Sequence, residues 1–131
     1  MGVRVAKVCE NFMPYRTNTL IWDMEFRHQF IHHVYFWLQH PDGSEDKARL
    51  IEGLRSLVNI PGIRMSHIGT PADTNRDVID VSYAVSWLVV FDDRATQDAY
   101  QEDPVHLKFV EDCSHLWTRV LVYDSVSAQP T

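Results

Sequence analysis

Polar and apolar residues alternate with two different periods along this chain, and the two periods predict strands and helices in turn. The segment FIHHVYFWL, residues 30–38, is rich in aromatic and β-branched residues, which is typical of a strand. Alternation places His33, Tyr35 and Trp37 on one face of this strand and His32 on the other. Both faces are largely apolar, so we expect the strand to be covered on both sides.

A helical period follows this strand. Its apolar residues have the spacing of a single buried helix face: Leu50, Ile51, Leu54, Leu57 and Val58. Either Asp42 together with Glu45, or Ser44 alone, is the expected cap of the first turn. The dipeptide Pro61-Gly62 is expected to end the helix.

The remaining sequence predicts a second helical segment and further strands. The strands are expected over residues 63–72, 78–91 and 118–126. Between the last two, a short helix leads to a break at Pro104, and proline is favoured in the first turn of a helix because its missing amide hydrogen is not needed there. Asp103 is the expected cap of this second helix, which we expect to run to about Trp117.

The predicted order of elements, β-α-β-β-α-β, indicates an α+β chain with the ferredoxin-like arrangement. It forms one antiparallel sheet with the helices on one face. The other sheet face is too apolar to meet water, so we expect a second copy to cover it and form a homodimeric α/β barrel. The expected domain spans residues 29–126, between an N-terminal extension or arm (1–28) and a short tail (127–131).

Composition excludes several other classes of protein. The chain has 131 residues, a net charge of −6 and no segment that concentrates Lys and Arg, so we expect no nucleic-acid partner. Cys9 and Cys113 are too far apart to form a metal-binding spacing, and reduced thiols in a cytoplasmic protein are expected. No signal peptide is evident, and no apolar run approaches the roughly 20 residues that cross a bilayer, so no membrane partner is expected.

One histidine falls on the apolar side of the second helix. At about 100° per residue, Val110, Cys113 and Trp117 lie within about 40° of His106. His106 is therefore expected to point between the helix and the sheet. It is either a core histidine that is satisfied by one backbone carbonyl or a residue of a pocket.

Other aromatic residues favour the pocket. Tyr100 precedes the proline break and is expected over the mouth of the same space. His33, which shares a face with Tyr35, can approach His106 if that face meets the helices. Phe109 and Trp117 are expected to wall the cavity. Adjacent strand residues point to opposite faces, so His32 and His33 cannot bind one metal ion together, and no metal site is expected.

Three segments carry a resemblance to a known family. HHVYFWL, YQEDPVHLKF and LWTRVLVYD resemble the stress-responsive dimeric α/β-barrel family, Dabb, over about residues 31–124. The resemblance implies a ferredoxin-like fold, a homodimer and a role in stress response. One plant branch of the family, similar to olivetolic acid cyclase, closes a polyketide chain by aldol condensation.

The resemblance to that branch also implies roles for single residues. His106 matches its general base, Tyr100 matches the tyrosine six residues earlier that orients the substrate, and His33 matches a pocket histidine on the first strand. Val85 stands where that branch has another histidine. A neutral imidazole can take a proton alpha to a carbonyl while the Tyr100 phenol donates to the developing oxyanion, and this chemistry needs no metal or cofactor.

Three hypotheses for function follow. The first is a cofactor-independent lyase, cyclase or isomerase that acts on a small apolar or aromatic carbonyl compound, with cofactor-free oxygenation, known in a related barrel family, as a subsidiary form. The second is a binding protein for such a compound without turnover, and the third is a structural dimer whose cavity is filled by side chains. The first two predict an open cavity beside His106, and the third predicts none.

Overall fold

A computed structural model describes residues 28–128 of the chain, of which His28–Ser127 form one compact unit. The elements are β1 (Phe30–Leu38), α3 (Ser44–Arg55), β2 (Ile63–Gly69), β3 (Val85–Phe91), α4 (Arg94–Glu102), α5 (Pro104–Cys113), the 3-10 turn η2 (Ser114–Leu116) and β4 (Trp117–Val126). The arm expected over residues 1–28 lies, except for His28, outside the described residues, as do Cys9 and residues 129–131. Within residues 28–128 no helix is long and apolar enough to span a membrane.

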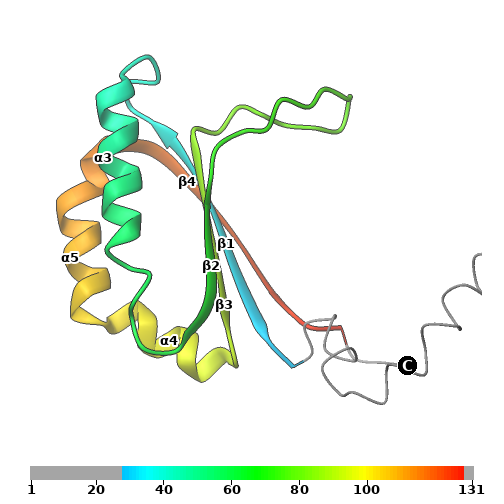
Figure 1. Ribbon diagram of the computed structural model, residues 1–131, viewed down its shortest axis with the longest axis vertical. Coiled ribbons are helices and arrows are strands. Elements are labelled where there is room, and N and C mark those ends of the chain that lie inside the picture. The colour runs from blue at the N-terminus through cyan, green and yellow to red at the C-terminus, as the bar shows by residue number, and fades with distance from the viewer. Residues whose placement is uncertain (1–27, 129–131) are drawn as a thin grey trace, which may run out of the picture. The chain divides into compact units, whose positions relative to one another are not determined.

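The four strands form one antiparallel sheet in the order β2-β3-β1-β4. Figure 1 shows α3, α4 and α5 together on one face of this sheet. The ferredoxin-like α+β arrangement expected from the order of the elements is confirmed. The opposite sheet face carries no helix within the described residues, and we call it the open face.

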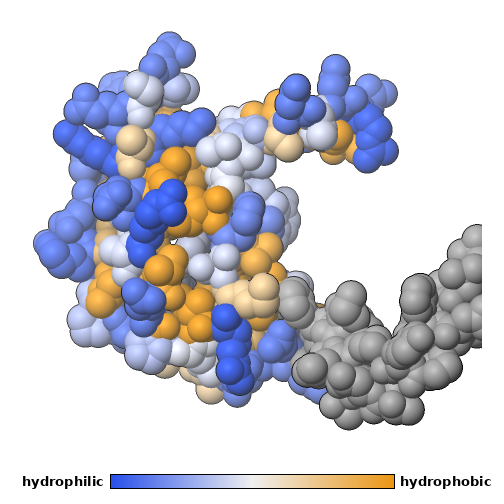
Figure 2. All heavy atoms as spheres, in the orientation of Figure 1, coloured by the Kyte–Doolittle hydropathy of each residue, from blue (hydrophilic) through white to orange (hydrophobic). Residues whose placement is uncertain are grey.

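Alternation along β1 fixes which side chains meet the helices. Every second residue from Phe30 to Leu38 is buried, and His32 is among them. His33, Tyr35 and Trp37 lie between these positions and face the open side. The buried set packs with apolar side chains of the helices and β3 in a single core, and Figure 2 shows apolar residues gathered between the helical layer and the sheet.

Helix α3 packs on the sheet through the face that its period predicts. Leu50 and Leu54 of α3 are fully buried, and so is Leu57 in the turns that follow it. The helix ends at Arg55, six residues before the expected stop at Pro61-Gly62, because the chain continues in turns. The expected side-chain cap is absent, because Gly43 takes the N-cap position and no side chain bonds to the first turn. The chain then reverses into β2 at Gly62, whose φ of 97° belongs to the left-handed region that favours glycine.

The long strand expected over residues 78–91 is correct only in its second half. β3 begins at Val85, and residues 70–84 form a loop that runs away from the sheet on its open side (Figure 1). The physical reason is the lack of a neighbour: β2 ends at Gly69, opposite Ser86, and β1 pairs with β3 only as far as Val85. Ala84 still donates its amide to the Phe36 carbonyl at 2.8 Å, after which the ladder stops.

The second helical segment breaks where the sequence predicts. Asp103 lies between α4 and α5, and its side chain accepts a hydrogen bond from the Val105 amide at 2.8 Å, so the expected cap is confirmed. Pro104 occupies the first turn of α5. The helix ends at Cys113 rather than near Trp117, because the chain tightens into η2 and Trp117 already pairs with Leu38 as the first residue of β4.

Candidate active-site cavity

A cavity of about 230 Å³ lies between α5 and the helix-facing side of β1 and β4. Its walls are mostly apolar and include Phe36, Phe109, Trp117, Val120 and Val122. Three of the residues that line it have titratable side chains, His32, Tyr100 and His106, and Gln101 and Trp87 add further polar atoms. The structure thus places His106, Tyr100, Phe109 and Trp117 around one space, as the sequence predicts.

His106 reaches the cavity because the break between the helices leaves a carbonyl free. Within a continuous helix the Gln101 carbonyl would accept from the Val105 amide, but that amide bonds to the Asp103 side chain instead. His106 Nδ1 lies 3.2 Å from this carbonyl oxygen, and its ring centroid lies 4.6 Å from that of Tyr100. Burial lowers the pKa of His106, and the Gln101 carbonyl opposes this shift only in part.

Tyr100 forms the floor of the cavity and not its mouth. It lies in the last turns of α4 and is only 2% exposed. Its hydroxyl oxygen accepts a hydrogen bond from the indole nitrogen of Trp87 at 3.0 Å. Burial raises the pKa of Tyr100 to about 12, so the phenol stays neutral near pH 7, and within residues 28–128 no acceptor takes its hydrogen.

His32 is the residue that the sequence reasoning missed. It is 6% exposed, its ring meets that of Tyr100 edge-on at 6.0 Å, and its Nδ1 lies 2.6 Å from a carboxylate oxygen of Asp124 on β4. Asp124 pairs directly with His32 across the sheet. The sequence could have indicated this position, because the other residues on the same face of β1 as His32 are all large and apolar: Phe30, Val34, Phe36 and Leu38.

The expected approach of His33 to His106 is wrong, because His33 and Tyr35 lie on the open face. The Tyr35 hydroxyl and His33 Nδ1 are 3.2 Å apart, and the centroids of the two tilted rings are 4.4 Å apart. The pKa of His33 is lowered, chiefly by burial and then by His67 and His32. The reason is the parity of β1: once Phe30 and Leu38 enter the core, the odd-numbered residues must face away from the helices.

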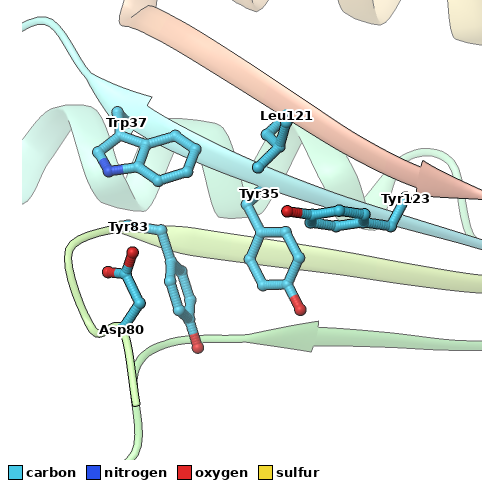
Figure 3. Close-up of a pocket in the computed structure, with 6 residues that line it drawn as sticks. All are labelled: Tyr35, Trp37, Asp80, Tyr83, Leu121 and Tyr123. Atoms are coloured by element: carbon cyan, nitrogen blue, oxygen red, sulfur yellow. The ribbon is translucent and has the colours of Figure 1, made fainter. Parts of the chain in front are cut away.

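A second cavity, of about 300 Å³, opens on that face (Figure 3). It is lined by Tyr35 and Trp37 from β1, Leu121 and Tyr123 from β4, and Asp80 and Tyr83 from the loop before β3. The ring of Tyr35 meets those of Tyr83 and Tyr123 edge-on at 5.0 and 6.1 Å. This concentration of aromatic side chains makes the open face a surface that is suited to burial.

Within residues 28–128 no group of three or more His, Cys, Asp or Glu side chains is arranged to hold a metal ion. Alternation places His32 and His33 on opposite faces, as expected, and Cys113 is buried against the core. The titratable groups of the first cavity are two imidazoles and a phenol, which can donate, accept and transfer protons.

Solved structures share this fold. A Dabb family protein with a ferredoxin-like fold from Mesorhizobium loti is 24% identical, with a TM-score of 0.65 over 77% of this chain and 98% of that one. A hydroxynitrile lyase from Passiflora edulis is 16% identical, with a TM-score of 0.65 over 79% and 97%. A dimeric ferredoxin-like protein of unknown function from Jannaschia is 23% identical, with a TM-score of 0.60 over 76% and 99%.

A search of curated proteins finds no match. The model of the stress responsive A/B barrel domain, however, matches residues 31–127, which is most of the chain. Among the described residues this range includes both cavities and all the strands and helices except Phe30, the first residue of β1. The resemblance that the three sequence segments carried is thereby confirmed, and the chain belongs to the stress responsive A/B barrel domain family, Dabb.

Proposed function

We propose that this Dabb protein binds a small apolar or aromatic carbonyl compound in the cavity beside α5 and moves a proton on it without a cofactor. The observation that carries the proposal is the position of His106. Its Nδ1 is held by a backbone carbonyl, its ring borders an open cavity, and its ring centroid lies 4.6 Å from that of the buried Tyr100. A reaction of the lyase, cyclase or isomerase type fits these groups.

The proton transfer balances with the groups present. Nε2 of His106 takes a proton from the carbon next to the carbonyl. The electron pair of that C–H bond forms a new C=C bond, and the π pair of the carbonyl moves to its oxygen to give an enolate. The Tyr100 hydroxyl donates a hydrogen bond to this oxygen as its charge grows. The imidazolium then returns the proton, to the same compound or to a leaving group. A lowered pKa keeps His106 neutral, which a base requires.

A binding protein without turnover is the second candidate, and one observation favours it. The hydrogen bond from His106 to a single backbone carbonyl is what a purely structural histidine makes, and the other walls of the cavity are mostly apolar. Both candidates use the same cavity, so the measurement that separates them is turnover rather than binding.

Exchange of the protons next to a ketone measures this turnover directly. We expect the wild-type protein to speed the exchange of the benzylic protons of phenylacetone in D₂O, followed by NMR. His106→Ala should lower the rate by about 10²–10⁴-fold, the usual contribution of a general base. His115→Ala is the matched control, because His115 is an exposed histidine in η2. Binding of phenylacetone without any faster exchange would reject the enzyme and leave the carrier.

The pH dependence of this rate follows from the lowered pKa of His106. The folded protein should hold His106 neutral at pH 7, so the rate should be constant from pH 7 to 8 and fall only below about pH 6.5, the ordinary pKa of histidine. Because the unfolded chain takes up this proton at a higher pH than the folded chain does, the same group makes folding less favourable as the pH falls through that range. A rate that rises on acidification would contradict the role of His106 as a base.

We also propose that the protein is a homodimer that pairs through its open face. That face carries the second, aromatic cavity and bears exposed apolar side chains, among them Met65 and Tyr123. Solved structures of the same fold are described as dimeric. Two such sheets pack at about 10 Å, which leaves room for interdigitated aromatic side chains.

A further inference from the structure

The hydrogen-bond partner of each cavity histidine fixes where its proton sits. A backbone carbonyl can only accept, so His106 Nδ1 must carry hydrogen to bond with Gln101, 3.2 Å away. A carboxylate also only accepts, so His32 Nδ1 must carry hydrogen to bond with Asp124, 2.6 Å away. In their neutral forms both rings therefore keep an unprotonated Nε2.

Both Nε2 atoms are open to a ligand. Neither has a hydrogen-bond partner within residues 28–128. In the same part of the chain no side-chain nitrogen or oxygen is both sealed from solvent and unpaired, so each Nε2 keeps contact with solvent. Both rings border the cavity of about 230 Å³, which is larger than the roughly 150 Å³ that accommodates benzene in an apolar protein site.

The three titratable side chains of the cavity thus have three different tasks. Tyr100 has a hydrogen to donate, which suits the carbonyl oxygen of the compound. His106 takes the reacting proton at Nε2. His32 has neither of these tasks, and its Nε2 is an acceptor that a bound apolar compound would cover and leave unpaired, at a cost in free energy.

We infer that the substrate carries a hydroxyl group that donates to Nε2 of His32, so that the compound is a hydroxylated aryl ketone rather than a plain one. The inference rests on the proposed function and adds the substrate class. Asp124 is then a positioning residue: it touches no substrate, but its carboxylate holds the proton of His32 on Nδ1 and so keeps Nε2 an acceptor. The rings of His32 and His106 both contact the ring of Tyr100. The position where His32 would bind the substrate hydroxyl therefore lies beside the reacting carbon.

Matched ketones test the substrate class. The affinities of 3- and 4-hydroxyphenylacetone are compared by calorimetry with those of their methyl ethers and of phenylacetone. At least one hydroxy compound should bind about tenfold more tightly than its ether, the size expected when a buried acceptor is left unpaired. Equal binding of hydroxy compounds and ethers would overturn the inference and leave the proposed function intact, whereas no binding by any of the five would reject both.

The role of Asp124 is tested by selectivity and by the proton position itself. In Asp124→Ala the ratio of hydroxy to ether affinity should fall from about tenfold to below about threefold, because His32 is free to place its proton on Nε2. A loss of packing alone would weaken both compounds alike and keep the ratio. Asp112→Ala is the control, since Asp112 is an exposed carboxylate that pairs with Lys108 on α5.

Nitrogen NMR of the ligand-free protein measures directly which ring nitrogen of His32 carries the proton. The spectrum of neutral His32 should show a protonated Nδ1 and a bare Nε2. If Asp124→Ala does not fold, Asp124→Asn replaces it, because asparagine preserves the size of the side chain. In this variant the nitrogen signals of His32 should shift away from those of a ring protonated only on Nδ1. A neutral wild-type ring that carries its proton on Nε2 would overturn the inference regardless of any ligand.

Discussion

At the scale of single residues, one step along β1 separates two different chemical environments. His32 and His33 are neighbours in sequence, yet one lies in the core beside Tyr100 and the other lies on the open face beside Tyr35. The sequence predicted that they face opposite ways but assigned His33 to the cavity. The assignment failed because both faces of the strand are apolar, so period alone could not tell which face meets the helices.

Tyr100 combines a role in the cavity with a role in stability, and the second can be measured alone. Tyr100→Phe removes the oxygen that accepts from Trp87, an indole that is only 1% exposed, and leaves a buried donor unpaired. We expect the free energy of unfolding to fall by about 1–3 kcal/mol. Urea denaturation measures it, with Leu107→Ala as the control because Leu107 is 56% exposed on α5 and its substitution should change stability by less than about 0.5 kcal/mol. A Tyr100→Phe protein as stable as the wild type would contradict the hydrogen bond.

At the scale of elements, the junction of α4 and α5 shows how a local signal places a functional side chain. The sequence predicted Asp103 as the cap and Pro104 in the first turn, and both are confirmed. The cap occupies the Val105 amide, which frees the Gln101 carbonyl to hold His106. By contrast, the predicted extent of β3 was wrong, because the length of a strand depends on where its neighbours end.

The cap itself can be tested without any ligand. Asp103→Ala removes the acceptor for the Val105 amide, and loss of such a cap typically costs about 1 kcal/mol of folding free energy. Thermal or urea unfolding should show this loss. Asp98→Ala, which removes an exposed carboxylate from the middle of α4, should stay within about 0.5 kcal/mol of the wild type. Equal effects of the two substitutions would mean that Asp103 contributes no cap.

At the scale of the whole molecule, the open face explains why both sides of β1 are apolar. The helix-facing side is covered by α3, α4 and α5 within the same chain. The other side, with Trp37, Leu121 and the phenol rings around Tyr35, has no helix over it within residues 28–128. Within residues 28–128 the single helical layer leaves this second apolar surface uncovered, and the proposed second copy would cover it.

The dimer is tested by mass in solution. Light scattering should give the wild-type protein twice the mass of one chain. Tyr123→Asp places a charge on the open face and should shift the protein towards the monomer while far-UV circular dichroism stays unchanged. Leu107→Asp is the control, since Leu107 is an exposed apolar residue on α5 and its substitution should leave the dimer intact. A monomeric wild type, or dissociation by both substitutions, would reject pairing through the open face.

The sequence by itself determined the order of the elements, the faces on which residues are grouped, the break at Pro104 and the inward direction of His106, because each of these follows from periods and caps within a few consecutive residues. Only the tertiary structure decided that His32 rather than His33 borders the cavity, that Asp124, 92 residues away in sequence, holds its ring, and that β3 starts at Val85. These features depend on which face of a strand the helices cover and on which strands become neighbours. Both depend on contacts between segments that are distant in sequence, and the periodicity of apolar residues within one segment does not predict such contacts.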